Sequence, residues 1–218
     1  MDDKQLEDLE TFIKIVKQNN ILARNVLEIG SRDGHHAEAL RCAFNIAPEN
    51  VHIVEPNPKQ HVRIIDEYPD ANLYGVAISN TEGIVTFNQI DSGDDGWDGI
   101  SGLMDRPEIY GQVRTNKISV MSMTGKSLLK MIKEEIDLCK IDVEGLTYEV
   151  LESFGEDLNK IKVLQIETEE NVIWENQKVD SQVSEYLTGM NFVKMDESFV
   201  ETKWGRQFDQ VWLNKSFV

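Results

Sequence analysis

The sequence predicts a doubly wound α/β domain with a mostly parallel sheet, an N-terminal cap helix and a C-terminal antiparallel hairpin. Short apolar runs alternate with stretches of helical spacing along most of the 218 residues, and the last two apolar runs follow one another without a helix between them. Such alternation is typical of a parallel sheet covered by helices on both faces, with ligands bound at the carboxyl ends of the strands. We expect residues 1–24 to form the cap helix and residues 25–218 the main domain.

Apolar periodicity assigns the elements in chain order. Residues 4–19 place apolar side chains at helical spacing with acids on the opposite face, which predicts a helix packed on the core. Short apolar runs predict strands at residues 25–30, 51–55, 73–78, 84–87, 117–121, 137–143, 163–166, 192–195 and 207–213. Helical spacing predicts helices at residues 35–45, 59–68, 125–133, 148–154 and 179–188.

Two connections stand out from this alternation. Residues 80–83 have turn composition, so we expect a hairpin that joins the strand at 73–78 to the strand at 84–87. Residues 91–112 carry five glycines among aspartates and predict a long irregular loop. Loops of this length in compact domains are usually functional or disordered.

Composition excludes several classes of partner. The chain has 22 basic and 39 acidic residues, a net charge of −17, which disfavours nucleic acid and membrane surfaces as partners. The N-terminus lacks the apolar segment of a secretory signal, and no window approaches the ~20 apolar residues of a membrane span. Cys42 and Cys139 form no CxxC pair, so we expect reduced, buried thiols and a cytoplasmic protein. The oligomeric state stays open.

A glycine-containing loop follows the first predicted strand. The pattern places Glu28 before Gly30, Ser31 and Gly34, with a helix after them. Glycines let a ligand approach the backbone, and a helix N-terminus offers free N–H groups. The pattern lacks the G-x-G-x-x-G spacing of dinucleotide binders, and a purely structural turn is an alternative interpretation.

An acid ends the second predicted strand. Glu55 lies 21 residues after Gly34, where a carboxylate can accept two hydrogen bonds from a ribose diol. The alternative is a surface carboxylate. A pyrophosphate would prefer a more cationic loop, so an acidic pocket suits a positively charged ligand without phosphate.

Three motifs together resemble the FkbM family of methyltransferases over residues 25–170. They are Val-Glu-Pro-Asn-Pro at residues 54–58, Val-Ala-Ile-Ser-Asn at 76–80 with Gly83 and Phe87, and Ile-Asp-Leu-Cys-Lys-Ile-Asp-Val-Glu-Gly at 136–145 with Val150 and Leu151. The resemblance implies a Rossmann-like seven-stranded methyltransferase fold with S-adenosylmethionine as cofactor. It also implies O-methylation, with a sugar, a glycan or a small hydroxylated metabolite as acceptor.

The resemblance also implies roles for single residues. Gly30 and Ser31 would line the methionine end of the cofactor, and Glu28 would orient that loop. Glu55, next to Pro56, would hold the ribose. The remaining implied contacts are Ala77 and Ile78 beside the adenine and Asp142 beside the methyl donor. The family usually has Asp at position 28, Ala at 31, Glu at 147 and Gly at 153, and the last two departures concern acceptor contacts.

Carboxylates at the predicted strand ends are candidates for the chemistry. A hydroxyl must lose its proton as it attacks a methyl group, and adjacent parallel strands bring Asp142, Glu144 and Glu167 to one edge. One of them is a candidate general base. Alternatively, Asp142 and Glu167 share a divalent cation, at a position that resembles the metal site of catechol-type methyltransferases; we do not assume this metal. In a third interpretation Glu144 caps the next helix and Glu167 is exposed.

Residues near the crevice are candidates for acceptor binding. His35 and its neighbour His36 open a helix beside the cofactor loop and are either an alternative base or merely exposed. Trp97 is suited to stack on a sugar, with Asp98 and Ser101 binding its hydroxyls, or it anchors a mobile loop. The sequence does not decide whether Trp174 and Trp204 line the crevice or pack in the core.

Two rival functions come from other classes. A nucleotide-cofactor oxidoreductase is disfavoured by the absence of G-x-G-x-x-G. A catalytically degenerate methyltransferase fold that serves as a binding module is disfavoured by the presence of Glu55 and Asp142.

Overall fold

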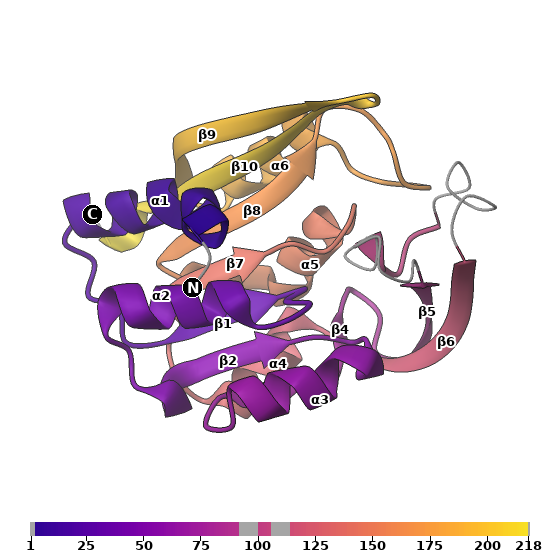
Figure 1. The fold of residues 1–218 in the computed structure, drawn as a ribbon. Helices are drawn as coiled ribbons and strands as arrows, with labels where there is room; N and C mark the ends of the chain where they lie inside the picture. The colour runs from indigo at the N-terminus through magenta and orange to yellow at the C-terminus, as the bar shows by residue number, and fades with distance from the viewer. Residues whose placement is uncertain (1–2, 92–99, 106–113, 218) are drawn as a thin grey trace.

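A seven-stranded sheet forms the centre of the protein. The computed structural model describes residues 3–91, 100–105 and 114–217. The strand order is β3-β2-β1-β7-β8-β10-β9, in which neighbours from β3 to β8 are parallel and β10 is antiparallel to both β8 and β9 (Figure 1). The strands of this sheet are β1 Val26–Ile29, β2 Val51–Val54, β3 Asn72–Tyr74, β7 Leu138–Ile141, β8 Val163–Glu169, β9 Phe192–Thr202 and β10 Gly205–Asn214.

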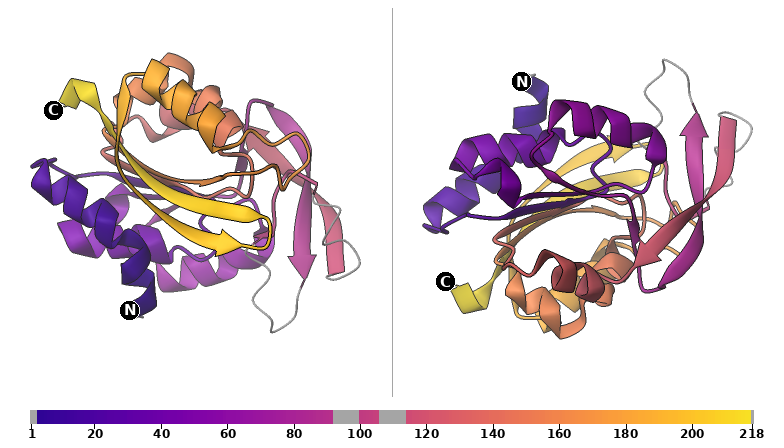
Figure 2. Two further views of the ribbon diagram at one scale, coloured as in Figure 1. Left: turned by 90° about the horizontal axis from the view of Figure 1, so that it is seen from above. Right: turned by 90° about the horizontal axis from the view of Figure 1, so that it is seen from below.

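Helices cover both faces of this sheet. Figure 2 shows the N-terminal helices on one face and the later ones on the other. The first group is α1 Asp3–Gln18, α2 His35–Phe44 and α3 Pro58–Glu67, and the second is α4 Gly125–Ile132, α5 Thr147–Phe154 and α6 Asp180–Gly189. Short 3₁₀ turns cover Pro48–Asn50, Gly155–Lys160 and Lys215–Phe217. None of the helices in the described residues is both long and apolar enough to cross a bilayer.

The central strands are buried on both faces, so their alternate residues enter two different cores. In β1, Val26 packs in the core beneath α1 and α2, whereas Leu27 and Ile29 pack in the core beneath α4 and α5. Side chains of successive strand residues point to opposite faces, and both faces here need apolar residues. This explains why the central strands read as continuous apolar runs.

A second, three-stranded sheet lies beyond the carboxyl ends of β1 and β2 (Figures 1 and 2). Its order is β4-β6-β5, from β4 Ala77–Ile78, β6 Arg114–Met123 and β5 Gly83–Asp91. The Asn57 side chain caps α3 by accepting from the Lys59 N–H, and it also accepts a 2.8 Å hydrogen bond from Gln89 of β5. This sheet therefore forms one wall of the crevice at the strand ends.

The strand predicted at 73–78 is wrong, because the chain divides at Gly75. β3 ends at Tyr74 in the large sheet and β4 starts at Ala77 in the small one, with a tight Val76 N–H to Tyr74 C=O bond of 2.9 Å between them. A Cβ at position 75 would lie 2.8 Å from the His61 ring, so glycine permits this close packing.

The hairpin predicted at 73–87 is also wrong, because β6 lies between β4 and β5. The chain crosses the end of β6 at Ser79, whose N–H donates to Met123 C=O and whose hydroxyl contacts that of Ser122 at 2.8 Å. A local turn signal contains no information about a strand 40 residues later that inserts between the two arms.

The lengths of β7, β8, β9 and β10 also differ from the sequence prediction. β7 ends at Ile141, so Asp142 lies just beyond the strand. β8 continues through Glu167 to Glu169, because its polar residues pair with β10. The C-terminal hairpin is present, but β9 and β10 each extend several residues further than their apolar runs.

Candidate functional site

The loop after β1 requires glycine at its first position. Gly30 has a φ of +80°, and a Cβ on it would lie 1.9 Å from the Asp142 carbonyl oxygen. The loop is pinned to the next strand by bonds from the Gly30 and Ser31 N–H groups to Val54 C=O. Gly30, just after β1, therefore contacts both the end of β2 at Val54 and the residue after β7, Asp142. The carboxyl ends of these three strands lie close together at this point.

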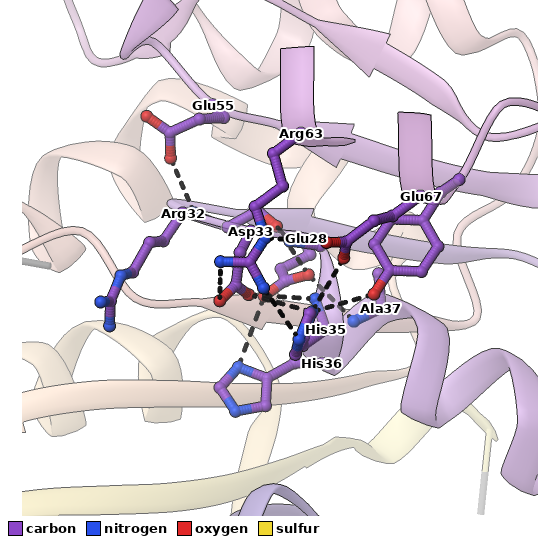
Figure 3. A network of polar contacts seen from close by, with 12 residues as sticks. Glu28, Arg32, Asp33, His35, His36, Ala37, Glu55, Arg63 and Glu67 are labelled. Carbon is purple, nitrogen blue, oxygen red and sulfur yellow. Dashed lines mark hydrogen bonds and ion pairs between the residues drawn. The ribbon is translucent and has the colours of Figure 1, made fainter. Parts of the chain in front are cut away.

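Glu28 is fully buried beneath this loop and holds it in place. Its Oε2 accepts hydrogen bonds from the Ser31 hydroxyl and the Ala37 N–H, both at 2.9 Å. The Ser31 hydroxyl in turn accepts from the Gly34 N–H at 2.9 Å. These contacts join the strand, the loop and the first turn of α2 (Figure 3).

Glu55 follows β2 and is 5% exposed. Its two carboxylate oxygens accept from the Arg32 N–H at 2.7 Å and the Asn57 N–H at 2.6 Å (Figure 3). Burial raises the pKa of Glu55 to about 7 despite these two hydrogen bonds, and the charges of Glu28 and Asp33 add to the increase. The carboxyl group is thus oriented by the backbone and faces the crevice.

A cavity lies between the loop, the end of β2 and the second sheet. Six residues predicted to bind the cofactor line it: Gly30, Glu55, Pro56, Ala77, Ile78 and Asp142. Apolar side chains that include Phe87, Leu103 and Leu146 complete the wall. The other three predicted residues, Glu28, Ser31 and Gly34, lie beneath or beside the loop and do not line the cavity.

Three carboxylates cluster around Asp142, which lines this cavity. Oxygens of Asp142, Glu144 and Glu167 all lie within 4.8 Å of one another. Oxygen ligands in such a group suit a hard divalent cation. The same spacing also brings either Glu144 or Glu167 within reach of a group held beside Asp142.

Lys140 distinguishes Asp142 from the other two acids. Its buried Nζ lies 2.6 Å from Asp142 Oδ2. Burial opposes ionisation of Asp142, but the charge and hydrogen bond of Lys140 and the charge of His36 keep the pKa of Asp142 below its usual value. Burial and the neighbouring charges of Asp142 and Glu144 raise the pKa of Glu167 well above its usual value.

The two histidines of α2 point in different directions. The His35 ring contacts the Tyr68 hydroxyl at 2.9 Å and the Arg63 guanidinium at 3.1 Å, against α3. The His36 ring points away from this group, with Nδ1 3.5 Å from Glu28 Oε1 (Figure 3). Of the pair, His36 therefore lies nearer the carboxylates.

The other predicted acceptor contacts fall in the segment around residue 100. The Ser101 hydroxyl accepts from the Ile90 N–H at 3.0 Å, and Ser101 lines the cavity beside Glu55. Trp97 and Asp98 lie outside the described residues.

Sequence reasoning missed Lys140 and Asn57. A lysine inside a continuous apolar strand needs a charged partner, so the position of Lys140 in the sequence indicates a buried ion pair. Asn before Pro at a helix start is typical of an N-cap, and this pattern indicates the role of Asn57.

Comparisons with known proteins show the family and the fold of this chain. A sequence model of the methyltransferase FkbM domain matches residues 28–203, whereas no curated protein matches the chain. The fold is similar to that of magnesium protoporphyrin IX methyltransferase from Synechocystis PCC 6803 with bound S-adenosylmethionine, with TM-score 0.55 and 10% identity over 97% of this chain and 80% of that chain. It is similar to an S-adenosylmethionine-dependent methyltransferase from Clostridium acetobutylicum, with TM-score 0.53 and 10% identity over 98% and 93% of the two chains.

A third similar structure is a protein of the NADB-Rossmann superfamily from Streptococcus agalactiae. Its TM-score is 0.52 and its identity 12%, over 98% of this chain and 68% of that chain. At these identities the similarity shows the fold alone. The predicted Rossmann-like α/β fold and the resemblance to the FkbM family are both confirmed.

Gly30→Ala should destabilise the protein by about 3 kcal/mol, because the new Cβ overlaps the Asp142 carbonyl and the backbone keeps a positive φ. Gly189→Ala is the control, since nothing lies within 4 Å of its added Cβ, and we expect a change of at most about 1 kcal/mol. Urea unfolding measures both. Equal free energies of unfolding for the two variants would contradict the close approach.

Proposed function

The chain belongs to the FkbM methyltransferase domain family, and we propose that it is an S-adenosylmethionine-dependent O-methyltransferase acting on a sugar, a glycan or a small hydroxylated metabolite. The observation that carries the proposal is the cavity lined by Gly30, Glu55 and Asp142, with two further carboxylates close to Asp142. The charge of −17 favours an acceptor other than nucleic acid.

The residues of this cavity fit the cofactor. Glu55 has both oxygens anchored by backbone N–H groups, and each oxygen can still accept a hydroxyl of the ribose. Ala77 and Ile78 are apolar residues of the cavity wall that the adenine can contact. The missing side chain of Gly30 leaves the backbone open to the methionine end, and nearby carboxylates favour a sulfonium.

The bound cofactor supplies an electrophilic methyl group, and the chain must hold the acceptor and take its proton. Among the three carboxylates, Asp142 is held ionised by Lys140 and is therefore a weak base. Glu167 has a carboxylate oxygen within 4.8 Å of one on Asp142. The raised pKa of Glu167 makes it a stronger base than Asp142. We assign Glu167 as the general base, with Asp142 and Glu144 positioning the hydroxyl.

A divalent cation held by Asp142, Glu144 and Glu167 is the alternative way to acidify the hydroxyl. Their mutual spacing within 4.8 Å favours it, and the ligands are of the right type. The ion pair between Lys140 and Asp142 argues against a bound cation, because the Lys140 ammonium already lies 2.6 Å from Oδ2 of Asp142.

Glu55 should make cofactor binding depend on pH. A ribose diol donates to the ionised carboxylate, so affinity for S-adenosylhomocysteine should fall about tenfold from pH 8 to pH 6 as Glu55 takes up a proton near pH 7. Glu55→Gln should weaken binding at pH 8 at least tenfold and flatten this dependence. Calorimetry measures both, with NAD as the control ligand that should not bind. Unchanged affinity in Glu55→Gln would remove the ribose assignment.

Glu167→Gln should lower kcat about 10²- to 10⁴-fold, because the variant cannot accept the acceptor's proton. Affinity for S-adenosylmethionine should stay within about threefold of wild type. The measurement is methyl transfer to the best substrate of a panel of hydroxylated sugars and metabolites. Glu156→Gln, at an exposed residue, is the control. A rate near that of the control would exclude Glu167 as the base.

A chelator should leave methyl transfer unchanged if a carboxylate is the base. We expect an EDTA-treated and dialysed enzyme to keep its rate within about twofold. Loss of activity that Mg²⁺ or Mn²⁺ restores would instead favour the cation-bound hydroxyl.

A further inference from the structure

The proposed cofactor cavity has a cationic side chain in an otherwise acidic wall. Of the described residues that line it, Arg32 is the sole lysine, arginine or histidine, whereas Glu55 and Asp142 supply carboxyl groups. Arg32 is solvent-exposed, and Figure 3 shows its side chain turned away from the neighbouring Asp33 and Arg63. The cofactor contacts proposed above make no use of its guanidinium.

The backbone conformation of Arg32 is one that an arginine rarely adopts. Its φ is +58°, in the left-handed region, which is costly for a residue with a Cβ and is visited mainly by Gly, Asn and Asp. Four of the seven described non-glycine residues with positive φ are indeed asparagines. Such strain is concentrated at binding and active sites, so it indicates a role for the Arg32 side chain.

The backbone of this loop has little left to offer an anion. A helix N-terminus usually binds anions through free N–H groups. Here the N–H groups of residues 30–35 all donate within the protein: those of Gly30 and Ser31 to Val54 C=O, that of Arg32 to Glu55, that of Asp33 to Ser31 C=O, that of Gly34 to the Ser31 hydroxyl and that of His35 to Asp33. An anion at this loop must therefore be held mainly by a side chain.

The cofactor brings such an anion into the cavity. The methionine part of S-adenosylmethionine carries a sulfonium, an ammonium and a carboxylate at neutral pH. Ionised Glu55 and Asp142 attract the first two groups and repel the third. Binding of the whole methionine part therefore requires a cation close to its carboxylate.

Arg32 lies beside both proposed cofactor contacts of the loop. Gly30, proposed to face the methionine end, comes two residues before it, and the Arg32 N–H donates to Glu55, proposed to hold the ribose, at 2.7 Å. A guanidinium can present two parallel N–H groups to a carboxylate, and its five donors allow it to keep a contact within the protein at the same time. Lys140 is less suitable, because it is buried, contacts Asp142 at 2.6 Å and does not line the cavity.

We propose that the Arg32 guanidinium binds the carboxylate of the cofactor's methionine part and so selects ligands that carry this carboxylate. The inference rests on the proposed function, because it takes Gly30 and Glu55 to hold the same cofactor molecule. It accounts for an arginine at a left-handed position that Asn or Gly would occupy with less strain.

The test compares two ligands that differ in this carboxylate alone. Calorimetry measures the affinity for S-adenosylhomocysteine and for its decarboxylated analogue, 5′-deoxy-5′-(3-aminopropylthio)adenosine, which keeps the ammonium group. The wild-type protein should bind S-adenosylhomocysteine at least about tenfold more tightly than the analogue. Arg32→Gln should reduce this ratio below about threefold, mainly through weaker binding of S-adenosylhomocysteine, and Arg32→Lys should keep part of the preference.

Arg32→Asn separates a binding role from a structural one. Asn adopts the left-handed conformation more readily, so this variant should unfold about 2 °C above the wild-type protein while it loses the ligand preference. Scanning calorimetry without ligand measures the midpoint. A lower midpoint together with an unchanged ligand ratio would show that Arg32 stabilises the loop instead, and would overturn the inference.

Arg63→Gln is the matched control, because Arg63 is an arginine 3.6 Å from Asp33 of the same loop and does not line the cavity. It should keep the full ratio. An unchanged ratio in Arg32→Gln, or the same loss in Arg63→Gln, would contradict the assignment. Equal wild-type affinities for the two ligands would remove this inference alone, whereas failure of the wild-type protein to bind S-adenosylhomocysteine would remove the proposed function with it.

Discussion

The buried charge of Lys140 is the constraint on which the rest of the site depends. Lys140 stands in register with Glu28 on the neighbouring strand, and its ammonium contacts Asp142 at 2.6 Å. A buried charge without a partner costs several kcal/mol, so lysine and acids must be present together. Because Glu28 also holds the Ser31 hydroxyl and the Ala37 N–H, one set of buried charges joins the cofactor loop to the candidate reaction centre.

The second sheet turns this edge into an enclosed site. Parallel strands bring backbone ends together, but they leave the edge open on its outer side. Here Gln89 of β5 bonds to Asn57 at the start of α3, and Phe87 of the same strand lines the cavity. Residues Ser101 to Leu103 of the same insertion also line this cavity.

Local features were predictable from the sequence, whereas features that depend on distant strands were not. The loop after β1 involves residues close in sequence, and motif and spacing locate it. The split at Gly75 depends on contact with His61, and the order β4-β6-β5 depends on a strand 40 residues later. Likewise, β8 continues to Glu169 because β10 pairs with it, which apolar periodicity cannot indicate.

The crowding of acids at the strand ends has a thermodynamic consequence for ligand binding. Lys140 offsets the charge of Asp142, but burial, together with the charges of Asp142 and Glu144, raises the pKa of Glu167, so ionising all three carboxyl groups brings repulsion between them. This repulsion lowers the stability of the folded protein, and apolar burial in the two cores must exceed it. A cationic ligand that enters between these groups removes part of the repulsion and binds only the folded state, so its binding energy also stabilises the fold. The same acids that make the site costly to form thus favour occupation by a sulfonium.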